Sequence, residues 1–168
     1  IIYPAFSDSL SINNIVSPYL AFKHHASTGL VLGIYDNGKE TVYAYGETAR
    51  GSGIEPNDST LFQIGSITKV FTGILLANSI HHQMVDSLSV LSKFLPDSIP
   101  KLAFKGKEIR LLDLAMHTSA LPREPSNLGS TITDERNPFA NYQEDDLMSY
   151  LKDAKLTYAV GEKYNYSN

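Results

Sequence analysis

The segment LFQIGSITKVFTGILLA (Leu61–Ala77) contains a single charged residue, Lys69, which lies three positions after Ser66. Residues three apart on a helix share a face, so the Ser66 hydroxyl and the Lys69 amine can come within hydrogen-bond distance. A serine hydroxyl becomes an effective nucleophile when a base takes its proton, and an amine desolvated by apolar neighbours can be that base. The pair therefore predicts acyl-transfer chemistry, with apolar surroundings that keep Lys69 neutral.

The Ser-x-x-Lys spacing also has a structural interpretation, in which the serine caps a helix and the lysine stem lies along an apolar surface. The spacing occurs three times, at Ser66/Lys69, Ser98/Lys101 and Ser149/Lys152. Pro100 interrupts the second pair, and the third lies on a polar helix. Only the first combines a helix start with an apolar wall, and spacing alone leaves both interpretations open.

The terminal segment YNYSN supplies a second group of candidates, Tyr166 and Asn168. A phenol can relay a proton once a neighbouring cation lowers its pKa, and a carboxamide can both donate to and accept from a peptide-like substrate. Taken alone, the segment is equally typical of a tyrosine-rich turn or strand end.

The elements that position these residues begin with an expected helix over 10–23, which starts or kinks at Pro18. Strands are expected at 30–35 and 40–46, because Asn37-Gly38 between two β-rich runs is a strong signal for a type I′ hairpin turn.

Further along the chain, apolar spacing predicts helices at 67–80, 109–116 and 143–154. The first of these is expected to be central and buried, and Gly73 would let another element approach it closely. A hairpin followed by several helices indicates an α+β fold. A two-stranded hairpin is marginal alone, so further strands are expected outside these residues.

Composition excludes several function classes. The chain has 14 basic and 18 acidic side chains, a net charge of -4 and no run of Lys and Arg, so nucleic acid is not an expected partner. No apolar stretch approaches the roughly 18 residues of a membrane span, so no transmembrane segment is expected. The absence of cysteine excludes disulfides, thiolate catalysis and cysteine-ligated zinc.

Other polar clusters have simpler explanations. His24-His25 and His81-His82 lack partners at zinc spacing, so no metal site is expected. Acidic residues at 144–146 suit a solvated first helical turn. Arg123 and Glu124 follow the loop HTSALP and are candidates for lining a substrate cleft.

Three segments in this order, FQIGSITKVFTGILLA, LLDLAMHTSALPRE and GEKYNYSN, resemble the serine β-lactamase and penicillin-binding-protein family in its class C branch. The sequence HTSALPRE is most similar to that of the AmpH-type D-alanyl-D-alanine carboxypeptidases and endopeptidases of that branch. The resemblance implies a β-lactamase/transpeptidase-like fold, an antiparallel sheet flanked by helices plus a helical subdomain, and no cofactor.

By that resemblance, Ser66 is the nucleophile, its backbone N–H forms half of an oxyanion hole, and Lys69 assists proton removal. Tyr166 carries the proton to the leaving amine, and Asn168 holds the substrate amide. Whether Lys69 or Tyr166 is the base stays open.

The chain departs from the family pattern in two loops and in one absence. Val160-Gly161 stands where the family usually has Pro-Gly, and Ala120 stands where it usually has glycine. The family's third motif, Lys or His followed by Thr or Ser and Gly, would lie well after Asn168. The triplet 117–119, His-Thr-Ser, only imitates it.

We therefore expect residues 1–168 to be the N-terminal portion of a single domain that needs its C-terminal strands, with little activity alone. Its expected parts are a helix and hairpin at 7–46, a nucleophile helix at 66–80, a helical subdomain at 81–160 and the Tyr-x-Asn segment at 164–168.

The expected function is a penicillin-binding serine hydrolase that acts on D-Ala-D-Ala-type amides of peptidoglycan, or binds a β-lactam, outside the cytoplasmic membrane. A class C β-lactamase and a carboxylesterase share the acylation step and differ in how fast water clears the acyl-enzyme. A receptor that is acylated without turnover is the alternative from another class. The family resemblance implies a periplasmic or secreted location.

Overall fold

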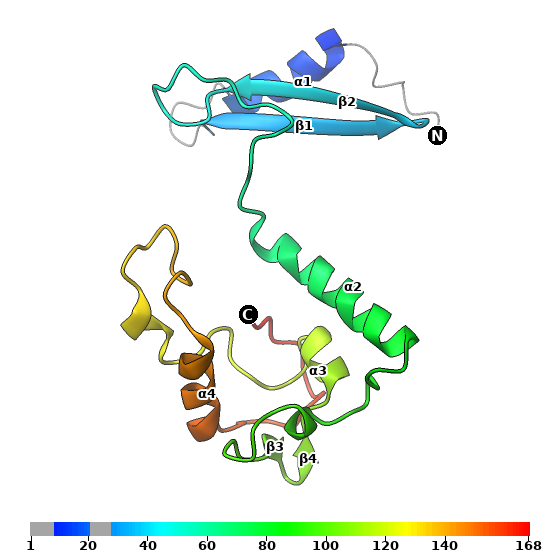
Figure 1. Cartoon of the computed structure of the whole chain (residues 1–168), viewed down its shortest axis with the longest axis vertical. Coiled ribbons are helices and arrows are strands. Elements are labelled where there is room, and N and C mark those ends of the chain that lie inside the picture. Colours follow the sequence, from blue (N-terminus) through cyan, green and yellow to red (C-terminus); the bar gives the residue numbers. More distant parts are fainter. Residues whose placement is uncertain (1–8, 21–27) are drawn as a thin grey trace. The chain divides into compact units, whose positions relative to one another are not determined.

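The computed structural model describes residues 9–20 and 28–168, and the chain divides into two units, Ile1–Ile64 and Gly65–Asn168. Among its described residues, the first unit contains one helix and one antiparallel hairpin (Figure 1). Its elements are α1 (Ser9–Leu20), β1 (Gly29–Asp36) and β2 (Lys39–Gly46). The expected strands are confirmed to within one residue at each end.

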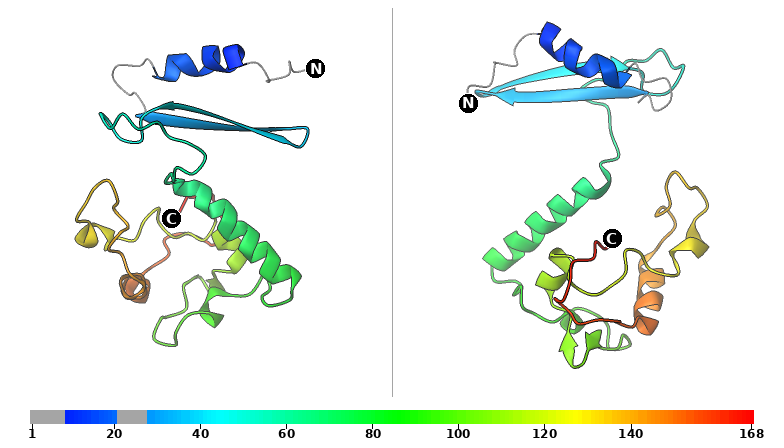
Figure 2. Two further views of the ribbon diagram at one scale, coloured as in Figure 1. Left: turned by 45° about the horizontal axis from the view of Figure 1, so that its top comes forward. Right: turned by 180° about the vertical axis from the view of Figure 1, so that it is seen from behind.

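The hairpin turn forms as its sequence predicts. Asn37 and Gly38 have φ angles of 48° and 81°, the positive values that a type I′ turn requires, and Asp36 pairs directly with Lys39. The helix lies along the hairpin in both views of Figure 2, and the Tyr45 hydroxyl donates a 2.7 Å hydrogen bond to the Asn13 side chain.

The helix α1 begins at Ser9, within one residue of the expected start. Pro18 lies inside it, so the alternative in which the helix starts at Pro18 is wrong. Ile12 and Val16, four residues apart, are both buried, so one face of α1 supplies apolar burial before the proline is reached. The last part of the expected helix, residues 21–23, and the pair His24-His25 lie outside the described residues.

The second unit contains three helices, a two-stranded hairpin and three 3₁₀ turns among its described residues. The helices are α2 (Thr68–His81), α3 (Leu111–Ala115) and α4 (Glu144–Asp153). The hairpin consists of β3 (Ala103–Phe104) and β4 (Lys107–Glu108). The 3₁₀ turns are Gly65–Ile67, Leu91–Lys93 and Leu128–Thr131.

A small apolar core lies within the second unit. Its buried members are Ile99, Leu102, Ile109, Leu151 and Val160. They come from the β3–β4 region, from α4 and from the segment before residue 161, so one cluster joins parts of the chain far apart in sequence. Burying one side chain of this size stabilises the folded state by about 1.5–3 kcal/mol.

Side chains fix where α3 and α4 begin. Asp113 accepts a 2.9 Å hydrogen bond from the backbone N–H of Arg110, and Asp146 accepts one of the same length from that of Gln143. In each case a carboxylate in the first turn satisfies an N–H that the helix leaves unpaired. The expected helix at 109–116 is shortened to α3 because Arg110 forms a β-bridge with Val90.

The expectation that α2 is buried is wrong for the described part of the chain. No residue of α2 is buried, and Phe71, Ile74 and Leu75 are 57%, 60% and 67% exposed. A Cβ added at Gly73 would meet no described atom within 4 Å. The apolar periodicity is correct, but no described element covers that face.

Candidate active site

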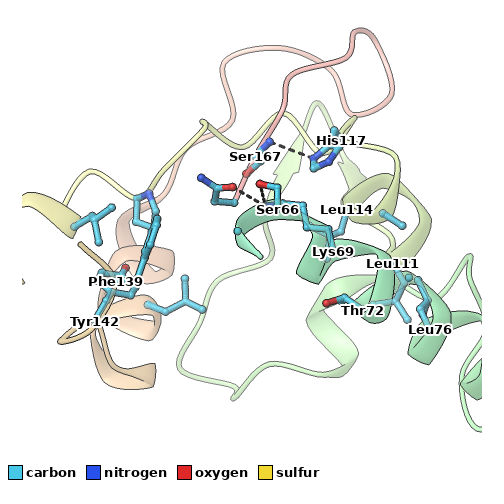
Figure 3. A pocket seen from close by; sticks show the side chains of 17 residues that line it. Ser66, Lys69, Thr72, Leu76, Leu111, Leu114, His117, Phe139, Tyr142 and Ser167 are labelled. Atoms are coloured by element: carbon cyan, nitrogen blue, oxygen red, sulfur yellow. Dashed lines mark hydrogen bonds between the residues drawn. The ribbon is translucent and has the colours of Figure 1, made fainter. Parts of the chain in front are cut away.

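Ser66 and Lys69 lie in contact at the start of α2, where the 3₁₀ turn Gly65–Ile67 leads into the helix. Lys69 Nζ donates a 3.4 Å hydrogen bond to Ser66 Oγ and a 2.7 Å hydrogen bond to Asn168 Oδ1 (Figure 3). The three-residue spacing thus produces the predicted contact between Ser66 and Lys69. The Asn168 side chain, 99 positions after Lys69, accepts a second hydrogen bond from the same amine.

Tyr166 reaches the same serine. Its hydroxyl is hydrogen-bonded to Ser66 Oγ, and Lys69 Nζ lies 4.9 Å from the centroid of its ring. The hydrogen bonds with Ser66 and then Lys69 lower the pKa of Tyr166, and the charges of Lys69 and Arg123 lower it further against the opposing effect of burial. A phenol with a lowered pKa is more readily a phenolate, the form that accepts a proton.

The Tyr-x-Asn segment is held in place by the loop that follows α3. Backbone N–H groups of Asn165 and Asn168 donate 2.8 Å hydrogen bonds to the carbonyls of His117 and Arg123. The N–H of Ser167 donates to His117 Nδ1 at 3.2 Å, as Figure 3 shows. These bonds tie two segments about 45 residues apart, so the position of Tyr166 depends on the conformation of the loop.

Two side chains of this loop contact Tyr166 directly. The His117 imidazole lies 4.6 Å from the Tyr166 ring, centroid to centroid, with 30° between their planes. The Arg123 guanidinium carbon lies 5.1 Å from the same ring centroid. Glu124 Oε1 accepts a 3.4 Å hydrogen bond from Asn168 Nδ2. Arg123 and Glu124 thus contact Tyr166 and Asn168, but neither lines the cavity beside Ser66, so the expectation that they line a cleft is not met there. His117 was not predicted to contact Tyr166.

No sequence spacing signals the contact of His117. The residue has a φ of 56°, in the left-handed region that few residues other than glycine adopt. The one available signal was the family resemblance, in which the segment LLDLAMHTSALPRE, containing His117, precedes the segment containing Tyr166.

A cavity of about 830 Å³ opens beside Ser66. Its polar end is formed by Ser66, Lys69, His117, Ser167 and Asn168. Large apolar side chains from several elements form much of the rest; among them are Leu76, Leu111, Leu114, Leu128, Phe139 and Leu147. Figure 3 shows Thr72 and Leu76 following Lys69 along α2, with Phe139 and Tyr142 across the cavity. A polar end and an apolar remainder suit a small organic ligand.

The predicted environment of Lys69 needs correction. The sequence predicts an apolar wall that desolvates the amine, yet Lys69 is half-buried and its nearest partners are the polar side chains of Ser66 and Asn168. The apolar residues that flank it on α2 are exposed in the described part of the chain. Hydrogen bonding, not apolar burial, is what the described residues supply to this amine.

The two other Ser-x-x-Lys pairs form no comparable arrangement. Lys101 is ion-paired with Glu108 at 3.2 Å, and its side chain is 72% exposed. Ser149 and Lys152 are both exposed on α4.

Across residues 9–20 and 28–168 the structure contains no cluster of three or more His, Cys, Asp or Glu residues arranged to hold a metal ion. Among the same residues, no helix has both the length and the apolar character needed to cross a bilayer.

The chain is similar to known proteins in both sequence and structure. The sequence matches the family described as Beta-lactamase over residues 12–168. The D-alanyl-D-alanine-carboxypeptidase/endopeptidase AmpH of Escherichia coli (strain K12) is 32% identical over 147 residues, which are 88% of this chain and 37% of that protein. A beta-lactamase of Providencia stuartii is 28% identical over 158 residues, 94% of this chain and 36% of that protein. The chain spans little more than a third of these relatives' length.

Two solved structures share the fold. A beta-lactamase/D-alanine carboxypeptidase from Yersinia pestis, complexed with citrate, superposes with a TM-score of 0.78 at 32% identity, covering 96% of this chain and 46% of that one. A class C beta lactamase superposes with a TM-score of 0.70 at 22% identity, covering 94% of this chain and 39% of that one. These likenesses confirm the predicted α+β, β-lactamase/transpeptidase-like fold.

Proposed function

The chain belongs to the beta-lactamase family, as its motifs predict, and from that premise we propose that Ser66 is the nucleophile of a serine acyl-transfer hydrolase acting on D-Ala-D-Ala-type amides of peptidoglycan. One observation carries the proposal: Ser66 Oγ contacts both Lys69 Nζ and the Tyr166 hydroxyl. Nucleophilic catalysis by a serine needs an adjacent group that can take its proton, and two candidates for that role contact this hydroxyl.

The reaction has two steps. Ser66 Oγ attacks the carbonyl carbon of the amide, and its proton passes to Tyr166, either directly or by way of Lys69. The C–N bond breaks, and the amine leaves with a proton from the Tyr166 hydroxyl. Water then attacks the Ser66 ester, the bond between the acyl carbon and Oγ breaks, and a proton taken from water returns to Ser66.

Asn168 and the 3₁₀ turn supply the remaining parts of the site. Asn168 Nδ2 is a donor for the carbonyl of a peptide-like substrate, which would replace its 3.4 Å contact with Glu124. The N–H groups at Gly65–Ile67 lie where the chain enters α2, and unpaired N–H groups at such a position stabilise an oxyanion. The backbone N–H of Ser66 is the donor we assign to this role.

The substrate class is supported by the relatives. The AmpH protein, named as a D-alanyl-D-alanine-carboxypeptidase/endopeptidase, is 32% identical to this chain. Peptidoglycan lies outside the cytoplasmic membrane, so the proposed location is the periplasm or the exterior. The proposed partners are a peptidoglycan peptide or a β-lactam, and the proposed chemistry uses no cofactor.

We also propose that these residues form the N-terminal portion of one domain, with the nucleophile helix at 66–80 and the Tyr-x-Asn segment at 164–168. The chain covers 37% of AmpH, and α2 exposes Phe71, Ile74 and Leu75. An apolar face of this kind is normally packed against further structure. The 168 residues alone are expected to have negligible activity.

The test is labelling of the whole protein with a fluorescent penicillin, followed by peptide mapping. A label on Ser66 supports the proposal, and a label on another serine, or no label, overturns it. Rapid nitrocefin hydrolysis would identify a β-lactamase, and hydrolysis of p-nitrophenyl esters without release of D-alanine would identify a carboxylesterase. Stoichiometric labelling without turnover of any substrate would identify a receptor.

A further inference from the structure

The Tyr166 ring lies within cation–π distance of two basic side chains from different segments. Lys69 Nζ is 4.9 Å and the Arg123 guanidinium carbon 5.1 Å from its centroid. Both distances are within the roughly 6 Å over which a cation is attracted to an aromatic face. Lys69 belongs to the proposed machinery, but Arg123 has no part in it so far.

We propose that Arg123 is a positioning residue of this site, which holds the Tyr166 ring and favours its phenolate over its phenol. The inference rests on the proposed role of Tyr166 as a proton carrier. A positive charge near a phenol stabilises the anion, so Arg123 widens toward lower pH the range in which Tyr166 can accept a proton.

The backbone on both sides of Arg123 is tied to the terminal segment. Its carbonyl accepts the N–H of Asn168 at 2.8 Å, and the carbonyl of Pro122 accepts the Ser167 hydroxyl at 2.7 Å. The side chain itself is 67% exposed. The anchored backbone places the guanidinium beside the ring, whereas the exposure makes its electrostatic effect modest and sensitive to salt.

Some of the other groups that face Tyr166 also change its pKa. Ser66 and Lys69 contact it from the start of α2, and both lower its pKa. The His117 ring stacks on it, and its Nδ1 accepts the Ser167 N–H. Glu124 opposes Arg123, because its carboxylate lies 3.9 Å from the Arg123 Nε. The charge of Arg123 is among the causes that lower the pKa of Tyr166, which agrees with the geometry.

The test compares variants of the whole protein by the pH dependence of penicillin acylation. Arg123→Gln should move the acidic limb to higher pH and slow acylation roughly threefold on that limb, the size expected for one solvated charge about 5 Å away. Arg123→Lys, which keeps the charge, should lie close to the unaltered protein. Glu124→Gln should move the limb the opposite way, and added salt should shrink all differences.

Arg136→Gln is the matched control, since Arg136 is 90% exposed and ion-paired with Asp134 at 2.9 Å. It removes the same net charge without touching Tyr166. An acidic limb that is identical in Arg123→Gln and Arg136→Gln would overturn the inference, as would one that moves equally in Arg123→Lys and Arg123→Gln.

A second measurement separates this inference from the proposed function. Ionisation of Tyr166 can be followed by tyrosinate absorbance, as the difference between each protein and its Tyr166→Phe counterpart. Arg123→Gln should raise the pH at which this signal appears, whether or not the protein reacts with penicillin. Failure of labelling with a shifted tyrosinate signal would refute the function and keep the inference, whereas an unshifted signal would refute the inference alone.

Discussion

Lys69 Nζ donates a 2.7 Å hydrogen bond to Asn168 Oδ1, although the two residues are 99 positions apart in sequence. The other end of the same amide, Nδ2, contacts Glu124. The Asn168 side chain therefore has partners at both ends and a defined orientation, with its oxygen toward the lysine. An amide oxygen is a neutral acceptor, so it holds Lys69 without adding a negative charge to the site.

Replacement of that neutral acceptor by a carboxylate should impair the site. In Asn168→Asp the new charge stabilises the ammonium form of Lys69 and opposes the phenolate form of Tyr166, so both candidate bases lose capacity. We expect acylation by penicillin to slow roughly 10- to 100-fold. The rate should be compared with that of Asn78→Asp, which adds the same charge at an exposed position of α2. Equal rates in the two variants would show that the contact has no role.

Lys69→Met should abolish most of the reactivity and leave the fold intact. The change keeps the apolar stem and removes the amine, and we expect acylation to fall about 10²- to 10⁴-fold. Lys69 is only half-buried, so the melting temperature should change little. Lys152→Met, in the exposed pair on α4, is the control and should label normally. Unfolding of Lys69→Met would favour the interpretation in which the lysine is structural.

His117→Asn tests the stack on Tyr166. Asparagine tolerates the φ of 56° at this position, but it cannot reproduce the ring that lies 4.6 Å from the phenol. We expect acylation to fall roughly 3- to 30-fold, with a stability loss of about 1 kcal/mol from the lost contacts. Acylation kinetics and urea denaturation measure the two effects separately. His81→Asn, at an exposed position, should change neither.

Asp113 should make stability depend on pH. Burial opposes ionisation of this 3% exposed residue, but hydrogen bonds from Arg110, assisted by nearby positive charge, leave the pKa of Asp113 below its ordinary value of 3.8. A carboxyl whose pKa is lower in the folded state stabilises the fold above the unfolded value. That stability is lost as the pH falls through the folded value.

Asp113→Asn should therefore lose about 1–3 kcal/mol near neutral pH, because Arg110 and the first turn of α3 lose their charged acceptor. The loss should shrink as the pH falls through the folded-state pKa of Asp113, which lies below the ordinary value, because Asp113 itself then becomes protonated. Urea midpoints at several pH values measure this, with the exposed Asp97→Asn as control. A loss that is constant with pH would contradict the assignment.

Sequence patterns predicted the features that depend on neighbours close along the chain. The turn at Asn37-Gly38 follows from two residues that tolerate positive φ, and the Ser66–Lys69 contact follows from helical spacing. The contacts of Ser66 and Lys69 with Tyr166 and Asn168 could be predicted only from the family resemblance. No local sequence pattern relates positions about a hundred residues apart.

The errors arise where tertiary contacts override local patterns. Arg110 has a helical pattern around it but pairs with Val90, which shortens α3. Ala120, for which no conformation was predicted, has a left-handed φ of 67° where the family usually has glycine. The periodicity of α2 correctly marks an apolar face, but periodicity cannot say which element covers it.

The separation of 100 residues between Ser66 and Tyr166 has a consequence for biogenesis. Contacts that close so long a stretch of chain form late, because the entropy of closure must be met by packing elsewhere first. On the proposed mechanism, a newly made chain therefore carries an ordinary, unreactive hydroxyl until folding brings Ser66 and Tyr166 together. Covalent capture of an antibiotic by this serine would thus time the maturation of the protein.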